Sequence, residues 1–91
     1  MADRLFLIKV DKKAEKSYLK MPEFYRRRVA ELGKVLKVKP VPAQEYDVSK
    51  LGGFEDTYRI RIGGIRIIYK VEWTAQQIAI IKIEWRGGAY K

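Results

Sequence analysis

The sequence predicts an α+β domain, in which an antiparallel sheet of about four strands packs on two N-terminal helices in the order β-α-α-β-β-β. Three observations predict it. Apolar residues recur at helical spacing in the first half of the chain, and they alternate at strand spacing in the second half. A Gly-Gly pair separates two of the alternating segments. The 91 residues, 47% of them hydrophobic, suit a single domain over 1–91 with one modest core.

The first half of the chain holds one predicted strand and both helices. Residues 4–10 are rich in Leu, Ile, Val and Phe, which is typical of a strand. A helix is predicted over 11–21 with Asp11 at its N-cap, and a second over 23–36 because Pro22 restarts the chain. Their apolar stripes are Ala14, Tyr18 and Met21 in the first helix, and Tyr25, Val29, Leu32 and Leu36 in the second. We expect the two helices to pack as a hairpin against the sheet.

The second half holds the remaining strands. Residues 37–50 include prolines at 40 and 42 and are expected to form an extended connection. From Phe54 onward the apolar period is two. The stretch TYRIRIGGIRIIYKV therefore predicts a hairpin that turns at Gly63-Gly64, and QIAIIKIEW predicts a third strand in this half.

The predicted hairpin has an apolar face and a basic face. With the turn at Gly63-Gly64, side-chain alternation places an apolar set against the helices: Tyr58, Ile60, Ile62, Ile65, Ile67, Tyr69 and Val71. The opposite face, here called the arginine face, carries Arg59, Arg61, Arg66 and Lys70, with Ile68 among them. In the last strand we expect Ala79, Ile81, Ile83 and Trp85 on the core face, and Ile78, Ile80, Lys82 and Glu84 on the arginine face. Arg86 follows directly, and Tyr90 lies in a short tail at the edge of the same face.

The predicted register places two like charges together. Arg61 lies directly across from Arg66, with Cβ atoms about 5 Å apart, and such pairing is destabilising. A bound phosphate would relieve the repulsion, because its oxygens match the forked donors of guanidinium groups. The alternative is an ordinary solvated sheet face, in which Glu84 neutralises Arg66 and Glu72 pairs with Lys70.

Composition narrows the possible chemistry. Lys and Arg number 20 against 11 Asp and Glu, so the net charge is +9, and we expect an anionic partner. The chain has no Cys and no His, which excludes disulfides, thiolate chemistry and an imidazole base. Asp47, Glu55 and Asp56 are too scattered to argue for a metal site, and we expect no metal and no cofactor. Without an apolar run of about 20 residues or a signal-peptide pattern, a cytoplasmic location away from any membrane is expected.

The segment YRIRIGGIRIIYKV, followed by an apolar strand and WRGGAYK, resembles the RelE family of bacterial and archaeal toxins. The similarity extends over nearly the whole chain and includes the KLGG at residues 50–53. The all-arginine form and the ending RGGAYK look like the archaeal branch. The resemblance implies a RelE-like fold and a type II toxin–antitoxin module. Its toxin enters the ribosomal A site and cuts messenger RNA without a metal, and an acidic RelB-like antitoxin wraps and blocks it.

The resemblance also implies site residues. The catalytic set by position is Arg59, Arg61, Arg66, Arg86 and Tyr90, with a shorter Arg-to-Tyr spacing than in the well-known bacterial branch. Cleavage by the RNA's own 2′-hydroxyl would give a 2′,3′-cyclic phosphate and a 5′-hydroxyl. Further basic residues are expected to hold RNA or the ribosome: Lys12, Lys13, Arg26, Arg27, Arg28 and Lys70. Two alternatives stay open, a ParE-like inhibitor of DNA gyrase on the same fold and a non-catalytic RNA-binding module, although Tyr58 and Tyr69 fall on the core face rather than among the arginines.

Overall fold

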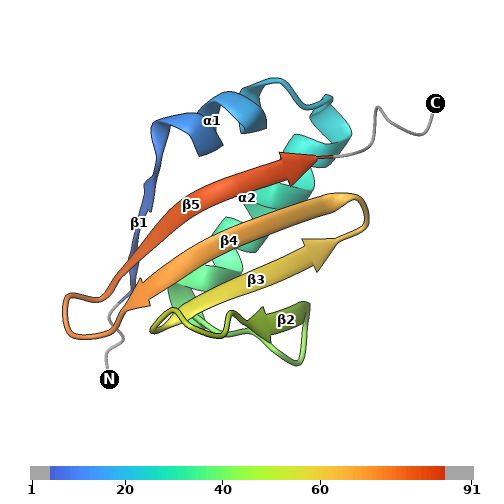
Figure 1. The fold of residues 1–91 in the computed structure, drawn as a ribbon. Helices are drawn as coiled ribbons and strands as arrows, with labels where there is room; N and C mark the ends of the chain where they lie inside the picture. Colours follow the sequence, from blue (N-terminus) through green and yellow to red (C-terminus); the bar gives the residue numbers. More distant parts are fainter. Residues whose placement is uncertain (1–4, 86–91) are drawn as a thin grey trace.

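The computed structural model describes residues 5–85 and shows two helices packed on one five-stranded sheet (Figure 1). The helices are α1 (Lys12–Leu19) and α2 (Glu23–Val38). The strands are β1 (Leu7–Val10), β2 (Asp47–Lys50), β3 (Thr57–Ile62), β4 (Ile65–Glu72) and β5 (Gln77–Trp85). The α+β class is confirmed, with one strand more than expected.

The sheet is mixed rather than wholly antiparallel. Its strand order is β1-β5-β4-β3-β2, and β1 runs parallel to β5 while all other neighbours are antiparallel. The prediction of an extended connection over 37–50 therefore missed one strand, because β2 forms at the end of this segment. The reason is that DVSK has a single apolar residue, Val48, so its alternation is too short to see in the sequence.

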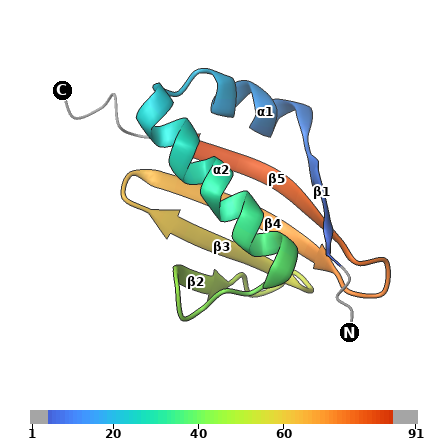
Figure 2. The same ribbon diagram turned by 180° about the vertical axis from the view of Figure 1, so that it is seen from behind.

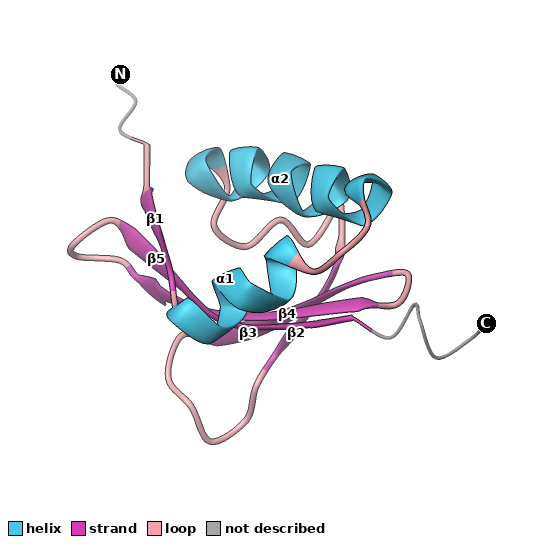
Figure 3. Ribbon diagram, turned by 90° about the horizontal axis from the view of Figure 1, so that it is seen from above, coloured by secondary structure: helices cyan, strands magenta, loops and turns pink. Residues whose placement is uncertain are grey.

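The two helices occupy different positions on the sheet. Seen from behind, α2 crosses in front of the central strands (Figure 2), and seen from above it lies wholly on one side of the sheet (Figure 3). The shorter α1 packs mainly against β5 and makes a smaller contact with α2, so the expected helical hairpin is loose. Asp11 occupies the N-cap of α1 as predicted, although its side chain makes no capping hydrogen bond. Neither described helix is long and apolar enough to traverse a lipid bilayer.

The core lies between α2 and the inner face of the sheet. Both predicted helical stripes point into it, with Ala14 and Leu32 each 1% exposed and Leu36 fully buried. From the sheet, the predicted apolar face of the hairpin completes this core, and Tyr69 is fully buried there. The Tyr69 hydroxyl donates a hydrogen bond of 2.7 Å to the Pro40 carbonyl oxygen, which ties the loop after α2 to the sheet.

The hairpin register is confirmed residue for residue. Ile62 pairs with Ile65, Arg61 with Arg66 and Ile60 with Ile67. Gly63 has a φ of +57° at the turn, a conformation that glycine adopts without strain.

The prediction for the first half of β5 was wrong because of a β-bulge. Ile68 pairs with Lys82 while Tyr69 pairs with Ile80, so Ile81 is the extra residue and side-chain parity reverses there. Ile78 and Ile80 are therefore core residues, at 0% and 6% exposed, and Ile81 is 41% exposed. Beyond the bulge the expectation holds, because Ile83 lies in the core and Lys82 and Glu84 share the arginine face.

Candidate nucleic-acid interface

Four charged residues form one row across the outer face of the sheet. Asp47 of β2 pairs with Arg61 of β3, and Arg61 pairs with Arg66 of β4. Arg66 in turn pairs with Glu84 of β5. The two arginines thus stand side by side between two carboxylates, an arrangement that offsets part of their mutual repulsion.

Arg59 stands in the neighbouring row of the same face. It pairs with Ser49 on one side and Ile68 on the other, and Ile68 pairs with Lys82. The Arg59 Nε atom is shielded from solvent and has no hydrogen-bond partner. Within residues 5–85, neither Arg59 nor Arg61 takes part in an ion pair. Arg61 is exposed and Arg59 is half-buried, so the described residues leave both guanidinium groups without an internal anion.

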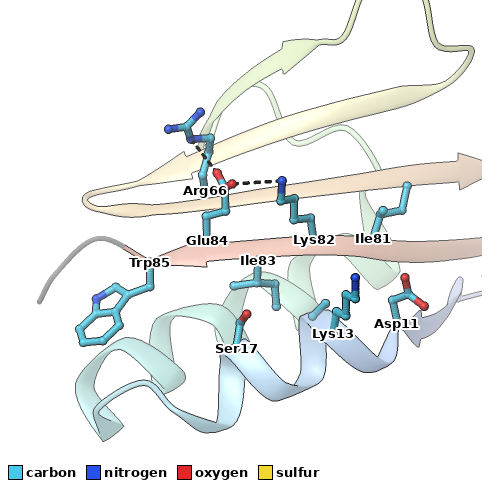
Figure 4. A pocket seen from close by; sticks show the side chains of 10 residues that line it. Asp11, Lys13, Ser17, Arg66, Ile81, Lys82, Ile83, Glu84 and Trp85 are labelled. Carbon is cyan, nitrogen blue, oxygen red and sulfur yellow. Dashed lines mark ion pairs between the residues drawn. The ribbon is translucent and has the colours of Figure 1, made fainter. Parts of the chain in front are cut away.

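Glu84 connects the two rows. Its Oε1 lies 3.5 Å from Arg66 Nε, and its Oε2 lies 3.2 Å from Lys82 Nζ (Figure 4). The suggestion that Glu84 neutralises Arg66 is thereby confirmed, whereas the described residues show no ion pair between Lys70 and Glu72. Arg66 is consequently the one guanidinium of the described arginine face that already has an anionic partner.

A groove runs between α1 and the C-terminal half of β5. It has a volume of about 760 Å³ and is lined by Asp11, Lys13, Ala14, Ser17, Arg66, Ile81, Lys82, Ile83, Glu84 and Trp85. It exists because β1 pairs only with residues 77–80 of β5, so the following residues have α1 rather than a strand beside them. Figure 4 shows Arg66, Lys82 and Glu84 gathered along one side of the groove and Lys13 and Ser17 on the other.

The remaining predicted RNA-binding residues are dispersed. Lys12 and Lys13 are exposed on α1, and Lys13 lines the groove. Lys70 is exposed on the arginine face, where it pairs with Thr57 and Ala79. The arginines of α2 lie on the helix that covers the opposite side of the sheet.

Each arginine of α2 has a local contact. Arg26 donates a 2.8 Å hydrogen bond to the Met21 carbonyl oxygen. Arg27 pairs with Glu23 at 3.1 Å. Arg28 lies over the Phe24 ring, 5.4 Å from its centroid. The structure therefore separates these three residues from the arginine face and leaves their role in ribosome binding a prediction.

Two predicted catalytic residues, Arg86 and Tyr90, lie outside the described residues. Conversely, sequence reasoning did not identify Asp47 as a neighbour of Arg61 or the groove beside β5. Asp47 lies in a four-residue strand with a single apolar residue. One apolar residue is too little to predict the strand or its register from the sequence. The groove depends on the bulge and on the parallel pairing of β1, and neither has a mark in the sequence.

Comparison with known proteins decides the family. A family model described as the ParE toxin of the type II toxin–antitoxin system parDE matches residues 8–90. The RelE1 protein of Methanocaldococcus jannaschii is 36% identical over 86 residues, which are 94% of this chain and 96% of that protein. The chain is a toxin of the RelE/ParE family. The resemblance inferred from the hairpin and the ending is therefore confirmed.

Solved structures of RelE toxins have the same fold. In the archaeal RelE–RelB complex of Pyrococcus horikoshii, the matched chain is 36% identical with a TM-score of 0.82, and the match covers 91% of this chain and 97% of that one. In the RelBE complex of Escherichia coli the values are 21% and 0.76, with 88% and 95% covered, which shows a shared fold. A RelE/ParE toxin of this kind belongs to a type II toxin–antitoxin system.

Proposed function

We propose that this toxin is a ribosome-dependent endoribonuclease that cuts messenger RNA in the ribosomal A site. The observation that carries the proposal is the adjacent pair Arg61 and Arg66, with Arg59 beside it and no internal partner for Arg59 or Arg61 within residues 5–85. Three guanidinium groups on one exposed face suit a bent phosphodiester better than they suit folding. The family match supports a toxin of this class.

RNA supplies its own nucleophile for this reaction. The 2′-oxygen attacks the adjacent phosphorus, a new 2′-O–P bond forms, and the P–O5′ bond breaks. The products are a 2′,3′-cyclic phosphate and a 5′-hydroxyl. The 2′-hydroxyl gives up its proton to a base, and the leaving 5′-oxygen takes a proton from water. An enzyme without His then acts mainly by aligning these atoms and by stabilising charge on the phosphate.

The roles follow from the chemistry of the side chains. Arg61 and Arg66 stabilise the charge that develops on the phosphate, because a guanidinium keeps its proton at neutral pH and donates two hydrogen bonds at once. Arg59 and Arg86 orient the substrate and stabilise the leaving oxygen. Tyr90 accepts the proton of the 2′-hydroxyl, because a chain without His offers no imidazole for that role.

The partners follow the same logic. Lys12, Lys13, Lys70 and the arginines of α2 hold ribosomal RNA through its phosphates without reading sequence. One solved archaeal relative is a RelE–RelB complex, and we propose that an acidic RelB-like antitoxin likewise covers the arginine face of this toxin. The toxin works in the cytoplasm, where ribosomes and messenger RNA are found.

The proposal is tested with purified ribosomes that carry a programmed message. Primer extension after addition of the toxin is expected to show discrete cuts within the codon in the A site. Arg61→Ala and Arg86→Ala should abolish the cuts, while Lys34→Ala, which removes a cation from α2, should retain them. Full cutting by both arginine variants would overturn the assignment.

The second candidate, gyrase inhibition, is favoured by the ParE description of the matching family model. An intact message combined with gyrase-dependent DNA cleavage would identify that activity. Simple RNA binding is disfavoured, because the described strand residues of the outer face include no aromatic side chain for base stacking.

A further inference from the structure

Glu84 contacts two cations on the arginine face. One carboxylate oxygen meets Arg66 Nε at 3.5 Å and the other meets Lys82 Nζ at 3.2 Å, so the carboxylate bridges two cations (Figure 4). A phosphate diester also presents two oxygens to basic groups, and it binds guanidinium with the same geometry as a carboxylate. Glu84 thus occupies a position suited to an RNA phosphate.

The contact is accessible from solvent. The side chains of Arg66 and Glu84 are each 39% exposed, and that of Lys82 is 59% exposed. Exposed ion pairs of this kind add little to stability and exchange readily with other ions. The groove beside β5 opens at the same three residues, which gives a ligand a route to them.

The pair Asp47 and Arg61, at the other end of the charged row, differs from Arg66 and Glu84 in its contacts. Asp47 is paired with Arg61 in the strand register, yet the structure shows no ion pair between them within residues 5–85. Within residues 5–85, Arg61 therefore has no internal anion, whereas Arg66 is paired with Glu84.

We infer that Glu84 is a displaceable internal anion that positions Arg66 and Lys82 and yields its place to a phosphate of bound RNA. The inference rests on the proposed RNA substrate. Without a ligand, Glu84 holds the Arg66 guanidinium on the arginine face. During binding, the RNA phosphate must compete with the Glu84 carboxylate, so Glu84 weakens the affinity of the toxin for free RNA. Tight binding then requires RNA that makes additional contacts with the toxin.

The experiment compares two substitutions that both raise the net charge from +9 by one, Glu84→Gln and Glu72→Gln. Glu72 is exposed at the far end of β4 and has no ion pair among the described residues, so it controls for bulk charge. Binding is measured by fluorescence anisotropy with a short labelled single-stranded RNA across a range of salt concentrations. Thermal unfolding of both variants confirms that each is folded.

Glu84→Gln is expected to bind the RNA about five-fold more tightly than wild type at low salt, with a steeper dependence of affinity on salt. Glu72→Gln should change affinity by less than about two-fold, because distant exposed charges are screened. Equal tightening by both variants would overturn the inference, since only bulk charge would then matter. Weaker binding by Glu84→Gln, or no RNA binding by wild type and variant alike, would overturn it as well.

The same proteins separate this inference from the proposed function. If Glu84→Gln tightens binding but wild type cuts no message on the ribosome, the displaceable anion stands and the nuclease proposal fails. If wild type cuts the message but Glu84→Gln and Glu72→Gln bind RNA equally, the nuclease proposal stands and the inference fails.

Discussion

Arg61 and Arg66 lie directly across from each other on β3 and β4, with Arg61 exposed and Arg66 held by Glu84. Two like charges in this position oppose folding by a few tenths of a kcal/mol up to about 1 kcal/mol. Arg61 takes part in no ion pair within residues 5–85, so its charge opposes folding without an internal contact that offsets the cost. This conflict between stability and function can be measured directly.

Arg61→Ala should separate the two effects. The free energy of unfolding at neutral pH should stay the same or rise by up to about 1 kcal/mol, because a cross-strand repulsion is removed. Cleavage of ribosome-bound message should fall by about 10²-fold or more, because a preorganised donor to the transition state is lost. Urea unfolding and single-turnover cleavage measure the two quantities. Arg61→Lys keeps the charge but loses the forked donation, so it should be folded and intermediate in rate. A variant that unfolds easily and still cuts would contradict the assignment.

Salt should distinguish the arginine face from α2. The logarithm of affinity for short single-stranded RNA should fall linearly with the logarithm of salt, by about 0.7 for each phosphate contacted. Replacing Arg59, Arg61 and Arg66 together by Ala should reduce this slope by about 2. Replacing Arg27 and Arg28 should leave the slope for short RNA unchanged, because α2 lies on the opposite side of the sheet, and should reduce the slope for ribosomes. The reverse pattern would place the RNA on α2.

The buried phenol of Tyr69 predicts a loss of stability in alkaline solution. Burial, with a smaller contribution from Tyr58, raises the pKa of Tyr69 above its ordinary value of 10.0. In the unfolded chain the phenol ionises near its ordinary value, so its contribution to stability is complete below pH 10.0 and is lost as the pH rises above it.

Tyr69→Phe tests this dependence. It should cost about 1–2 kcal/mol at neutral pH, because the Pro40 carbonyl oxygen loses its donor. The difference in unfolding free energy between wild type and variant should then shrink between pH 9 and 11, at about 1.4 kcal/mol per pH unit once the unfolded phenol is ionised. Chemical denaturation across this pH range measures the difference in unfolding free energy. A difference that does not change with pH would contradict a buried, protonated Tyr69.

The bulge in β5 predicts opposite tolerance at two neighbouring isoleucines. Ile81→Asp should change the unfolding free energy by no more than about 1 kcal/mol, because that side chain is exposed. Ile83→Asp should cost more than about 4 kcal/mol or prevent folding, because a charge would enter the core. Expression yield and thermal unfolding of the pair measure the contrast. Severe damage from Ile81→Asp would show that side chains alternate without interruption along β5.

Much of this fold follows from periodicity, and the exceptions have physical causes. The register of β3 and β4 could be worked out because Gly63-Gly64 fixes the turn and every second residue is apolar. The pairing of β1 with β5 could not, since strands distant in sequence carry no mark of their partner. The bulge at Ile81 was hidden because five of the nine residues of β5 are Ile or Ala, so both faces look apolar in the sequence.

The candidate site was predictable to the same extent. Arg59, Arg61 and Arg66 share a face as expected, because they belong to the one hairpin whose geometry the sequence determines. The partners supplied by other strands were only partly visible. Glu84 was predicted on the arginine face because the simple alternation still holds beyond the bulge. Asp47 was not predicted there, because its strand, β2, has no clear sign in the sequence.

The insertion of β5 between β1 and β4 has a consequence for the synthesis of this toxin. Among the described strands β5 comes last in the chain, and until it has been made the edge strand β1 has no strand to pair with. A nascent chain therefore cannot assemble the row that ends in Glu84 until β5 has been translated. Assembly of the sheet, and with it the charged row that ends in Glu84, therefore depends on the strand that comes last in the chain among those described.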